Sequence, residues 1–260
     1  MKYLVIGPGA LGLFSLVGLL HKIKHKLDDV EEISGASAGS LIGLFLSLNK
    51  ETDEILDFLL SADMKKYYKF NLKNFIKNFG FINLHETKHL YLDFFGYDPT
   101  FKDLKKKLYV AVYNVNYDRT EYLSVDTHPD MSVIDAVIIS MSIPFLLTST
   151  VMNDNYYIDG GIYDQIPLAP FLGKKKEDVL CVKLEISNIH NRKIKSLKDF
   201  VQFLFSKTLS SCSEKYDLNF FTIIKIFPDE NINILDFKMS HEDKIKLFFN
   251  GYNQPLPNLA

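Results

Sequence analysis

The chain has 260 residues, of which 47% are hydrophobic and 24% are charged, a composition ordinary for a globular protein with a sizeable core. Its formal net charge of −2 argues against nucleic acid as a main partner. Cys181 and Cys212 are too few for a disulfide framework, so we expect a reducing compartment, the cytoplasm.

The first elements predict the beginning of a parallel α/β fold. Residues 2–6 form an apolar strand, residues 7–12 a glycine-rich loop and residues 10–24 an apolar helix. The uncharged stretch 3–20 is long enough to cross a membrane, but glycines break it and no signal-peptide cleavage pattern follows. We therefore expect a soluble chain without a targeting or membrane-spanning segment, in at most peripheral contact with membranes.

A second strand, residues 30–34, leads into Gly35-Ala36-Ser37-Ala38-Gly39, and an apolar helix follows at residues 40–46. This is a Gly-x-Ser-x-Gly pattern. A serine on a sharp strand-to-helix turn needs small neighbours, and its hydroxyl lies beside helix amides that stabilise negative charge. The same pattern also suits a serine that merely caps the helix, so it leaves both interpretations open.

Thr52 begins the next helix, and residues 64–101 then differ in character. In this segment lysines interleave with aromatic residues: Lys65, Lys66, Lys69, Lys73 and Lys77 with Tyr67, Tyr68, Phe70, Phe75, Phe79 and Phe81. The composition suits a lid or an insertion that lies on a lipid surface. We favour instead a solvated helical face whose aromatic side chains are buried in the core.

The rest of the chain continues the alternation of strands and helices. We predict a strand at 108–115 with a hairpin partner at 121–125, a helix at 133–141 capped by Ser132, a strand at 156–158 that runs into Asp159-Gly160-Gly161, a strand at 179–184, a helix at 197–209, a strand at 221–227 and a helix at 240–250. No repeat or linker divides these elements. We therefore expect one domain over residues 1–260.

The glycine loop Gly7-Pro8-Gly9-Ala10-Leu11-Gly12 is a literal G-x-G-x-x-G between a strand and a helix. It predicts dinucleotide binding, with Glu31 or Glu32 as the ribose ligand. However, both acids precede their strand, whereas a ribose ligand belongs at the strand's carboxyl end. The free amides of such a loop also suit an oxyanion hole.

His85-Glu86-Thr87-Lys88-His89 is a literal H-E-x-x-H. On a helix, His85 and His89 would share a face and bind zinc. Lys88 would then place a positive charge beside the metal, and no third histidine follows at short spacing. We favour an exposed helical turn without a metal.

Four of these segments, in order, resemble the patatin-like phospholipase family. They are the glycine loop 7–12, Gly35–Gly39, Ser140-Met141-Ser142-Ile143-Pro144-Phe145, and Tyr157-Ile158-Asp159-Gly160-Gly161-Ile162-Tyr163 followed by Pro167. Leu235-Asp236-Phe237 and Gly251-Tyr252 are similar to the family's closing pattern. The resemblance spans almost the whole chain and implies a three-layer α/β/α sandwich with a mostly parallel central sheet.

The resemblance also implies hydrolysis of lipid esters, of the phospholipase A or lysophospholipase type, through an acyl-enzyme. The substrate would be phospholipid or lysophospholipid met in transient contact with a membrane, and neither metal nor cofactor would be needed. By this match Ser37 is the nucleophile and Asp159 its base, in a Ser–Asp dyad. The supporting motif residues are Gly12, Gly35, Gly39, Pro144, Gly160 and Gly161.

The resemblance places the oxyanion hole in the glycine loop, at Gly7, Gly9 and Ala10. The amides of Gly9 and Ala10 are the expected donors, because Pro8 has no N–H. Pro8 interrupts a run that is usually all glycine, and Leu11 stands where the family usually has a basic residue. These two departures motivate the alternative of a catalytically weak lipid-binding protein, beside the remaining alternative of an NAD(P)-binding reductase.

Overall fold

The computed structural model describes residues 1–62, 66–67, 69–185, 194, 200, 216–229, 232–234 and 236–257. Its strands are β1 (Tyr3–Ile6), β2 (Glu32–Ala36), β3 (Gly80–Ile82), β4 (Lys107–Asn114), β5 (Arg119–Leu123), β6 (Phe145–Leu147), β7 (Thr150–Met152), β8 (Asn155–Asp159), β9 (Val179–Leu184) and β10 (Thr222–Ile226). Its helices are α1 (Leu13–Lys22), α2 (Ala38–Ser47), α3 (Thr52–Ser61), α4 (Leu72–Asn78), α5 (Lys88–Phe95), α6 (Val133–Ser140) and α8 (His241–Tyr252). The predicted helix at 197–209, apart from Phe200, and Leu235 of the predicted closing pattern lie outside the described residues.

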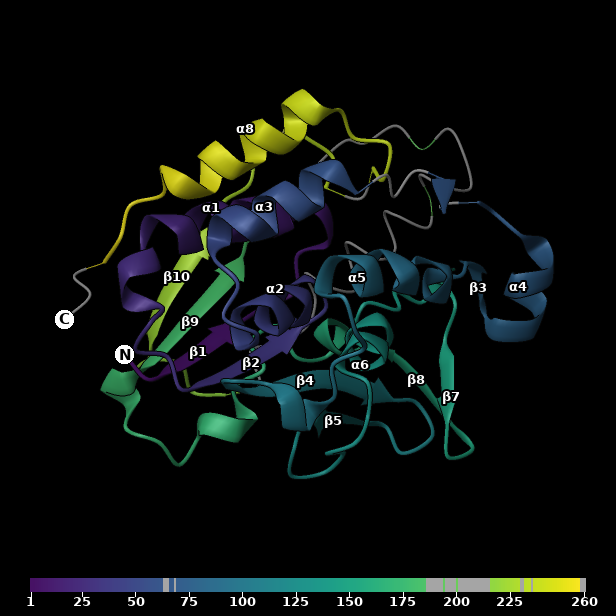
Figure 1. The fold of residues 1–260 in the computed structure, drawn as a ribbon, viewed down its shortest axis with the longest axis horizontal. Helices are drawn as coiled ribbons and strands as arrows, with labels where there is room; N and C mark the ends of the chain where they lie inside the picture. The colour runs from purple at the N-terminus through teal and green to yellow at the C-terminus, as the bar shows by residue number, and fades with distance from the viewer. Residues whose placement is uncertain are drawn as a thin grey trace.

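Eight strands of the described residues form one sheet, in the order β10-β9-β1-β2-β4-β8-β7, with β5 paired to β4 (Figure 1). The strands from β10 to β4 pair in parallel. The pairs that involve β5, β7 and β8 are antiparallel. The predicted α/β fold with a mostly parallel central sheet is therefore confirmed, and the antiparallel strands gather at one end of it.

Successive side chains of a strand point to opposite faces of the sheet, and each face is covered by its own core. On one face, Leu4 and Ile6 of β1 join the buried residues of α1, α2 and α6 in the larger core. On the other face, Val5 and Cys181 pack with a segment that contains a short helical turn at residues 169–171. Helix α8 lies outside α1 and α3 on the first face (Figure 1).

Two helices begin at serine caps, of which the sequence predicts Ser132. Ser132 accepts a hydrogen bond from the amide of Asp135 at the start of α6, and Ser240 accepts one from Asp243 at the start of α8. Each serine satisfies an amide that the first helical turn leaves without an intrahelical acceptor. None of the helices in the described part of the chain combines the length and the apolar character that crossing a membrane requires.

Residues 64–101 differ from the prediction that their aromatic side chains are buried. Tyr91 of α5 is buried, but Phe70 and Phe79, on either side of α4, are 58% and 52% exposed. Helix α4 contacts β3 on the side of Phe75, whose ring stacks on Phe81 with 4.4 Å between centroids. The prediction is wrong for Phe70 and Phe79, because each ring contacts one neighbouring ring, of Phe81 and Tyr156 respectively, and more than half of each side chain stays exposed.

Candidate active site

Strands β2 and β8 meet end to end along one edge of β4. The pairing of β2 with β4 ends at Ala36 opposite Ala111, and Asp159 of β8 lies opposite the next residue, Val112. Because β2 is parallel to β4 and β8 is antiparallel to it, the carboxyl ends of β2 and β8 face each other. Ser37, which follows β2, therefore lies beside Asp159 although 122 positions separate them.

Ser37 lies on a sharp turn between β2 and α2. Its backbone angles, φ 53° and ψ −123°, fall outside the regions that non-glycine residues favour. Such strain costs about 1–3 kcal/mol and is a feature of strand-to-helix nucleophile turns. The side chain makes no capping bond to α2; instead its Oγ donates a hydrogen bond of 2.7 Å to Oδ2 of Asp159. Ser37 is therefore not a simple side-chain cap of the helix.

Asp159 is buried, with only 2% of its surface exposed. Its Oδ1 accepts a hydrogen bond of 2.7 Å from the amide of Gly161, and its own amide donates to the carbonyl of Ser142 at 3.0 Å. Burial raises the pKa of Asp159 to about 7, against the opposing effect of the hydrogen bonds from Ser37 and Gly161. A carboxyl group with this pKa can both take and return a proton near neutral pH.

Ser140, at the end of α6, fixes the backbone of Ser37. Its Oγ accepts a hydrogen bond of 2.9 Å from the amide of Ser37 and donates one of 2.7 Å to the carbonyl of Ala111. Two residues on, the carbonyl of Ser142 holds the amide of Asp159. This segment thus positions both residues of the pair. The family resemblance includes this segment but implies no role for its serines.

The predicted role of one residue of the glycine loop, Gly7, is wrong. The amide of Gly7 donates to the carbonyl of Val182 at 2.8 Å and so continues the pairing of β1 with β9. It is therefore not available to an oxyanion, contrary to the prediction. The amides of Gly9 and Ala10 have no acceptor among the described residues, and Gly12 closes the loop by donating to the carbonyl of Gly9 at 2.8 Å.

Ala38 supplies an amide that the sequence interpretation did not include. It is the first residue of α2, and it lines the same cavity as Ser37 and Ala10. The first amides of a helix have no intrahelical acceptor, and nucleophile turns commonly use the amide that follows the serine. Its position directly after Ser37 is the signal by which it could have been found.

Small residues of the motifs allow close backbone contacts around the site. A Cβ at Gly39 would lie 2.1 Å from the carbonyl oxygen of Ile6, and one at Gly161 would lie 2.4 Å from Cβ of Pro8. Helix α2 therefore packs directly on the end of β1, and Pro8 occupies the space beside the turn after Asp159. Of the remaining predicted motif residues, Gly35 lies in β2, Gly160 directly follows β8 and Pro144 directly precedes β6.

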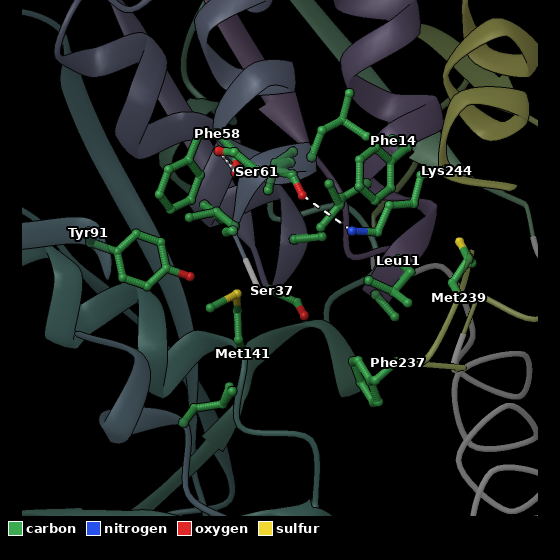
Figure 2. Close-up of a pocket in the computed structure, with 18 of the residues that line it drawn as sticks. Leu11, Phe14, Ser37, Phe58, Ser61, Tyr91, Met141, Phe237, Met239 and Lys244 are labelled. Carbon is green, nitrogen blue, oxygen red and sulfur yellow. Dashed lines mark hydrogen bonds between the residues drawn. The ribbon is translucent and has the colours of Figure 1, made fainter. Parts of the chain in front are cut away.

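An apolar cavity of about 290 Å³ opens beside Ser37. Figure 2 shows Ser37 with Met141 on one side, Leu11 and Phe237 on the other, and Lys244 of α8 across the cavity. The lining residues are Ala10, Leu11, Leu13, Phe14, Ser37, Ala38, Leu41, Phe58, Leu59, Leu60, Ser61, Ala62, Leu84, Tyr91, Met141, Ile143, Leu147, Phe237, Met239, His241 and Lys244. Most of this wall is hydrocarbon, so the cavity suits an apolar ligand chain.

His85 and His89 do not share one helical face. A short 3-10 turn at residues 84–87 precedes α5, so the two histidines lie on different elements. The Nε2 atom of His85 pairs with the hydroxyl of Thr150 at 2.9 Å, and that of His89 pairs with the hydroxyl of Tyr67 at 2.6 Å. The imidazoles point to different partners, which argues against the zinc alternative.

Glu31 and Glu32 lie near the amino end of β2, whereas the glycine loop follows the carboxyl end of the parallel strand β1. Glu31 pairs with Lys2 at 2.7 Å, and Glu32 pairs with Lys174 at 2.7 Å. Neither acid can reach the ribose of a nucleotide whose phosphates lie at the loop. The geometry therefore argues against the dinucleotide alternative.

Known sequences resemble this chain over most of its length. A family model described as patatin-like phospholipase matches residues 4–172. A probable lipid hydrolase, 463L of Invertebrate iridescent virus 6, is 26% identical over 267 residues, which cover 96% of this chain and 86% of that protein. The uncharacterized protein R571 of Acanthamoeba polyphaga mimivirus is 28% identical over 273 residues, with 95% and 90% covered.

Two solved structures share the fold. VipD from Legionella pneumophila superimposes with a TM-score of 0.60 at 19% identity, over 97% of this chain and 65% of VipD. The type III effector ExoU of Pseudomonas aeruginosa gives a TM-score of 0.51 at 15% identity, over 97% of this chain and 51% of ExoU. The chain thus spans just under two thirds of the first structure and about half of the second, and the likeness at these identities is one of fold.

Proposed function

This chain belongs to the patatin-like phospholipase family, and on that premise we propose that residues 1–260 form one hydrolase domain that cleaves carboxylic esters of lipids. Ser37 is the nucleophile and Asp159 the general base. The observation that carries the proposal is the 2.7 Å hydrogen bond from Ser37 Oγ to Asp159 Oδ2 at the wall of an apolar cavity. It supplies what a weakly nucleophilic hydroxyl needs, a base within hydrogen-bond reach.

In the first half-reaction, Ser37 Oγ attacks the ester carbonyl carbon while its proton passes to Asp159 Oδ2. The tetrahedral intermediate then collapses, the bond to the leaving alkoxide breaks, and Asp159 returns the proton to that oxygen. The pKa of Asp159, raised to about 7 by burial, favours both transfers near neutral pH because the carboxyl is neither a very weak base nor a very weak acid there.

The oxyanion of the intermediate needs donors that are already in place. The amides of Gly9 and Ala10 support this role because they have no acceptor in the described part of the chain. The amide of Ala38 adds a third donor at the start of α2, where the helix dipole also favours negative charge. Gly7 is left out of this set.

In the second half-reaction, water attacks the acyl carbon on Ser37, and Asp159 accepts its proton. The bond to Ser37 Oγ breaks, the serine recovers its proton from Asp159, and a fatty acid leaves. The apolar lining keeps bulk water away from the acyl chain, while Asp159 remains positioned by Gly161 and Ser142.

The proposed substrates are phospholipids or lysophospholipids, by phospholipase A or lysophospholipase chemistry. A volume of about 290 Å³ is near the lower limit of ligand pockets, ~300 Å³, which favours one acyl chain inside the protein and the rest of the lipid outside. Lys244 lines the cavity and supplies a positive charge for an anionic head group. Such lipids are met at membrane surfaces, so transient membrane contact belongs to the proposal.

The test is covalent labelling by a fluorophosphonate, which reacts with activated serines. We expect wild type to be labelled and Ser37→Ala not to be. Ser61→Ala is the matched control, because Ser61 lines the same cavity but its hydroxyl donates to the carbonyl of Phe58 in its own helix at 3.1 Å. Labelling of Ser37→Ala at the wild-type rate contradicts the nucleophile assignment.

The second test is Asp159→Asn, with thermal unfolding recorded in parallel. We expect fatty-acid release from mixed phospholipids to fall by at least about a thousandfold, because the amide cannot accept the serine proton. Near-normal turnover in a folded variant contradicts the dyad.

Pro8 and Leu11 in the oxyanion loop favour one second candidate, a lipid-binding protein of low activity. Vesicle binding by wild type without fatty-acid release supports this candidate.

A further inference from the structure

Helix α4 turns its most apolar face to solvent. Leu72 and Ile76 lie one turn apart on α4, and Phe79 follows as its left-handed C-cap, with the edge of its ring against Tyr156; these three residues are here called the α4 face. They are 66%, 73% and 52% exposed. Ordinary surface helices bury their apolar face, as α3 does with Ile55 and Phe58.

The helix is nonetheless held in place on its opposite side. Asn71 caps it by accepting a hydrogen bond from the amide of Lys73, and Phe75 stacks on Phe81 of β3. The carbonyl of Asn78 accepts from the amide of Ser149 at 2.9 Å. These contacts fix α4 in place without the help of Leu72 and Ile76, so burial of these two side chains is not needed to hold the helix. Exposed apolar patches of this kind mark interaction sites.

The charge beside the α4 face has one sign. Lys69, Lys73 and Lys77 recur every four residues, and the last two lie on the helix next to Leu72 and Ile76. The sequence contains no acidic residue from Lys69 up to Glu86. An apolar face flanked by lysines is complementary to a surface that is anionic outside and hydrocarbon beneath, as an acidic lipid bilayer is.

The α4 face is connected to the cavity through the two-stranded sheet of β3 and β6. Gly80, directly after Phe79, pairs with Phe145, and Ile82 pairs with Leu147, which lines the cavity. Phe145, at the end of the sheet nearest α4, is 59% exposed. Figure 1 shows α4 and β3 at one end of the molecule, away from α8. The small sheet of β3 and β6 would therefore join a lipid surface bound at α4 to the cavity wall at Leu147.

We propose that the α4 face, with Lys69, Lys73 and Lys77 beside it, is the surface by which this protein binds an anionic lipid bilayer. The proposal rests on the lipid-ester hydrolase function proposed above, and it names the surface through which that enzyme meets its substrate. Leu72, Ile76 and Phe79 enter the acyl boundary, and the lysines contact phosphate groups of the lipid heads.

The test is flotation of the full chain with vesicles of phosphatidylglycerol and phosphatidylcholine made from ether-linked lipids, which an ester hydrolase cannot cleave. We expect wild type to bind, and the variant that combines Leu72→Ser and Ile76→Ser to bind at least about tenfold more weakly. Leu172→Ser is the control, because Leu172 is 49% exposed but lies far from α4 in the chain. Equal binding by wild type and the α4 variant overturns the proposal.

Hydrolysis of a water-soluble short-chain ester separates this proposal from the proposed function. We expect the α4 variant to hydrolyse it at the wild-type rate, and Ser37→Ala to lose hydrolysis yet bind vesicles normally. If the α4 variant changes only the elution volume of the protein in size exclusion and not its vesicle binding, then the α4 face joins copies of this chain and the membrane proposal is wrong.

Discussion

The turn at Ser37 and the α4 face are specified by different kinds of constraint. Around Ser37, individual atoms are fixed: the amide by Ser140 and the hydroxyl by Asp159. On α4, the side chains of Leu72 and Ile76 project into solvent and only their apolar character and spacing are defined. The first region needs particular residues at particular positions, and the second needs an amphipathic composition.

This difference predicts two kinds of mutational response. A change of one atom group at the Ser37 turn displaces reacting atoms, and a misplacement of about 1 Å can cost about a hundredfold in rate. A change on the α4 face removes one part of a sum of apolar and charge contacts, so its effect is small and graded. The predictions below test this contrast, beginning with the largest effect.

After the loss of Ser37 or Asp159 themselves, the largest effect is expected from Gly39→Ala, because the new methyl group would lie 2.1 Å from the carbonyl oxygen of Ile6. To relieve this overlap α2 must move away from β1 and carry Ser37 with it. We expect ester hydrolysis to fall at least about a hundredfold and the free energy of unfolding to fall by about 3 kcal/mol. Gly173→Ala is the matched control, since no atom of the described residues lies within 4 Å of its Cβ position. An active, fully stable Gly39→Ala contradicts the packing argument.

The pH dependence of hydrolysis should follow Asp159, whose pKa burial raises to about 7. Only the ionised carboxylate can accept the proton of Ser37, so kcat/KM should rise about tenfold per pH unit below 7 and level off above it, a gain of roughly a hundredfold between pH 5 and pH 8. Initial rates on a soluble ester across this range measure it. A midpoint near pH 4 would show that burial does not govern this carboxyl group.

The same carboxyl group should make folding stability depend on pH in the opposite direction. Between the unfolded value near 3.8 and the folded value of about 7, the native state holds a proton that the unfolded state has lost. The contribution of Asp159 to stability is therefore greatest below about pH 4 and declines as the pH rises to 7, by up to about 4 kcal/mol. Denaturant unfolding of wild type and Asp159→Asn at pH 5 and pH 8 isolates this contribution, which the variant should lack.

A smaller effect is expected from Ser140→Ala, which removes the acceptor for the amide of Ser37 and the donor to Ala111. We expect kcat to fall about tenfold with KM unchanged, because Ser140 positions the nucleophile without lining the cavity. Ser142→Ala is the control, because its hydroxyl donates to the carbonyl of Ile138 and the carbonyl of residue 142 still accepts from the amide of Asp159 in the variant. Equal losses of kcat in the two variants contradict a specific role for Ser140.

The elements around Ser37 and Asp159 could be predicted because local sequence specifies them. Small residues on both sides of Ser37 predict its turn, and apolar runs predict β1, β2 and β9. The contact between Ser37 and Asp159 could not be derived from spacing, because it depends on β2 and β8 sharing one edge of β4. Only the family resemblance paired the two residues in advance of the structure.

The errors have equally specific causes. Gly7 looks like part of a free loop, but its amide continues the ladder between β1 and β9, and sequence does not reveal where a ladder ends. The aromatic character of Phe70 and Phe79 predicts that their side chains are buried, yet their burial depends on which residues pack against them at the two ends of α4. Both errors concern tertiary neighbours rather than local conformation.

The smallest effects are expected from single lysines beside the α4 face. Lys73→Gln or Lys77→Gln should each weaken binding to anionic vesicles about fivefold, since a lysine near such a surface contributes about 1 kcal/mol. The losses should add in the double variant, and they should vanish at high salt because screening removes the attraction. Lys175→Gln, an exposed lysine distant in the chain, is the control. If either single change instead abolished binding, the lysine would act as a specific head-group ligand, and the contrast between a graded surface and an atom-specific site would fail.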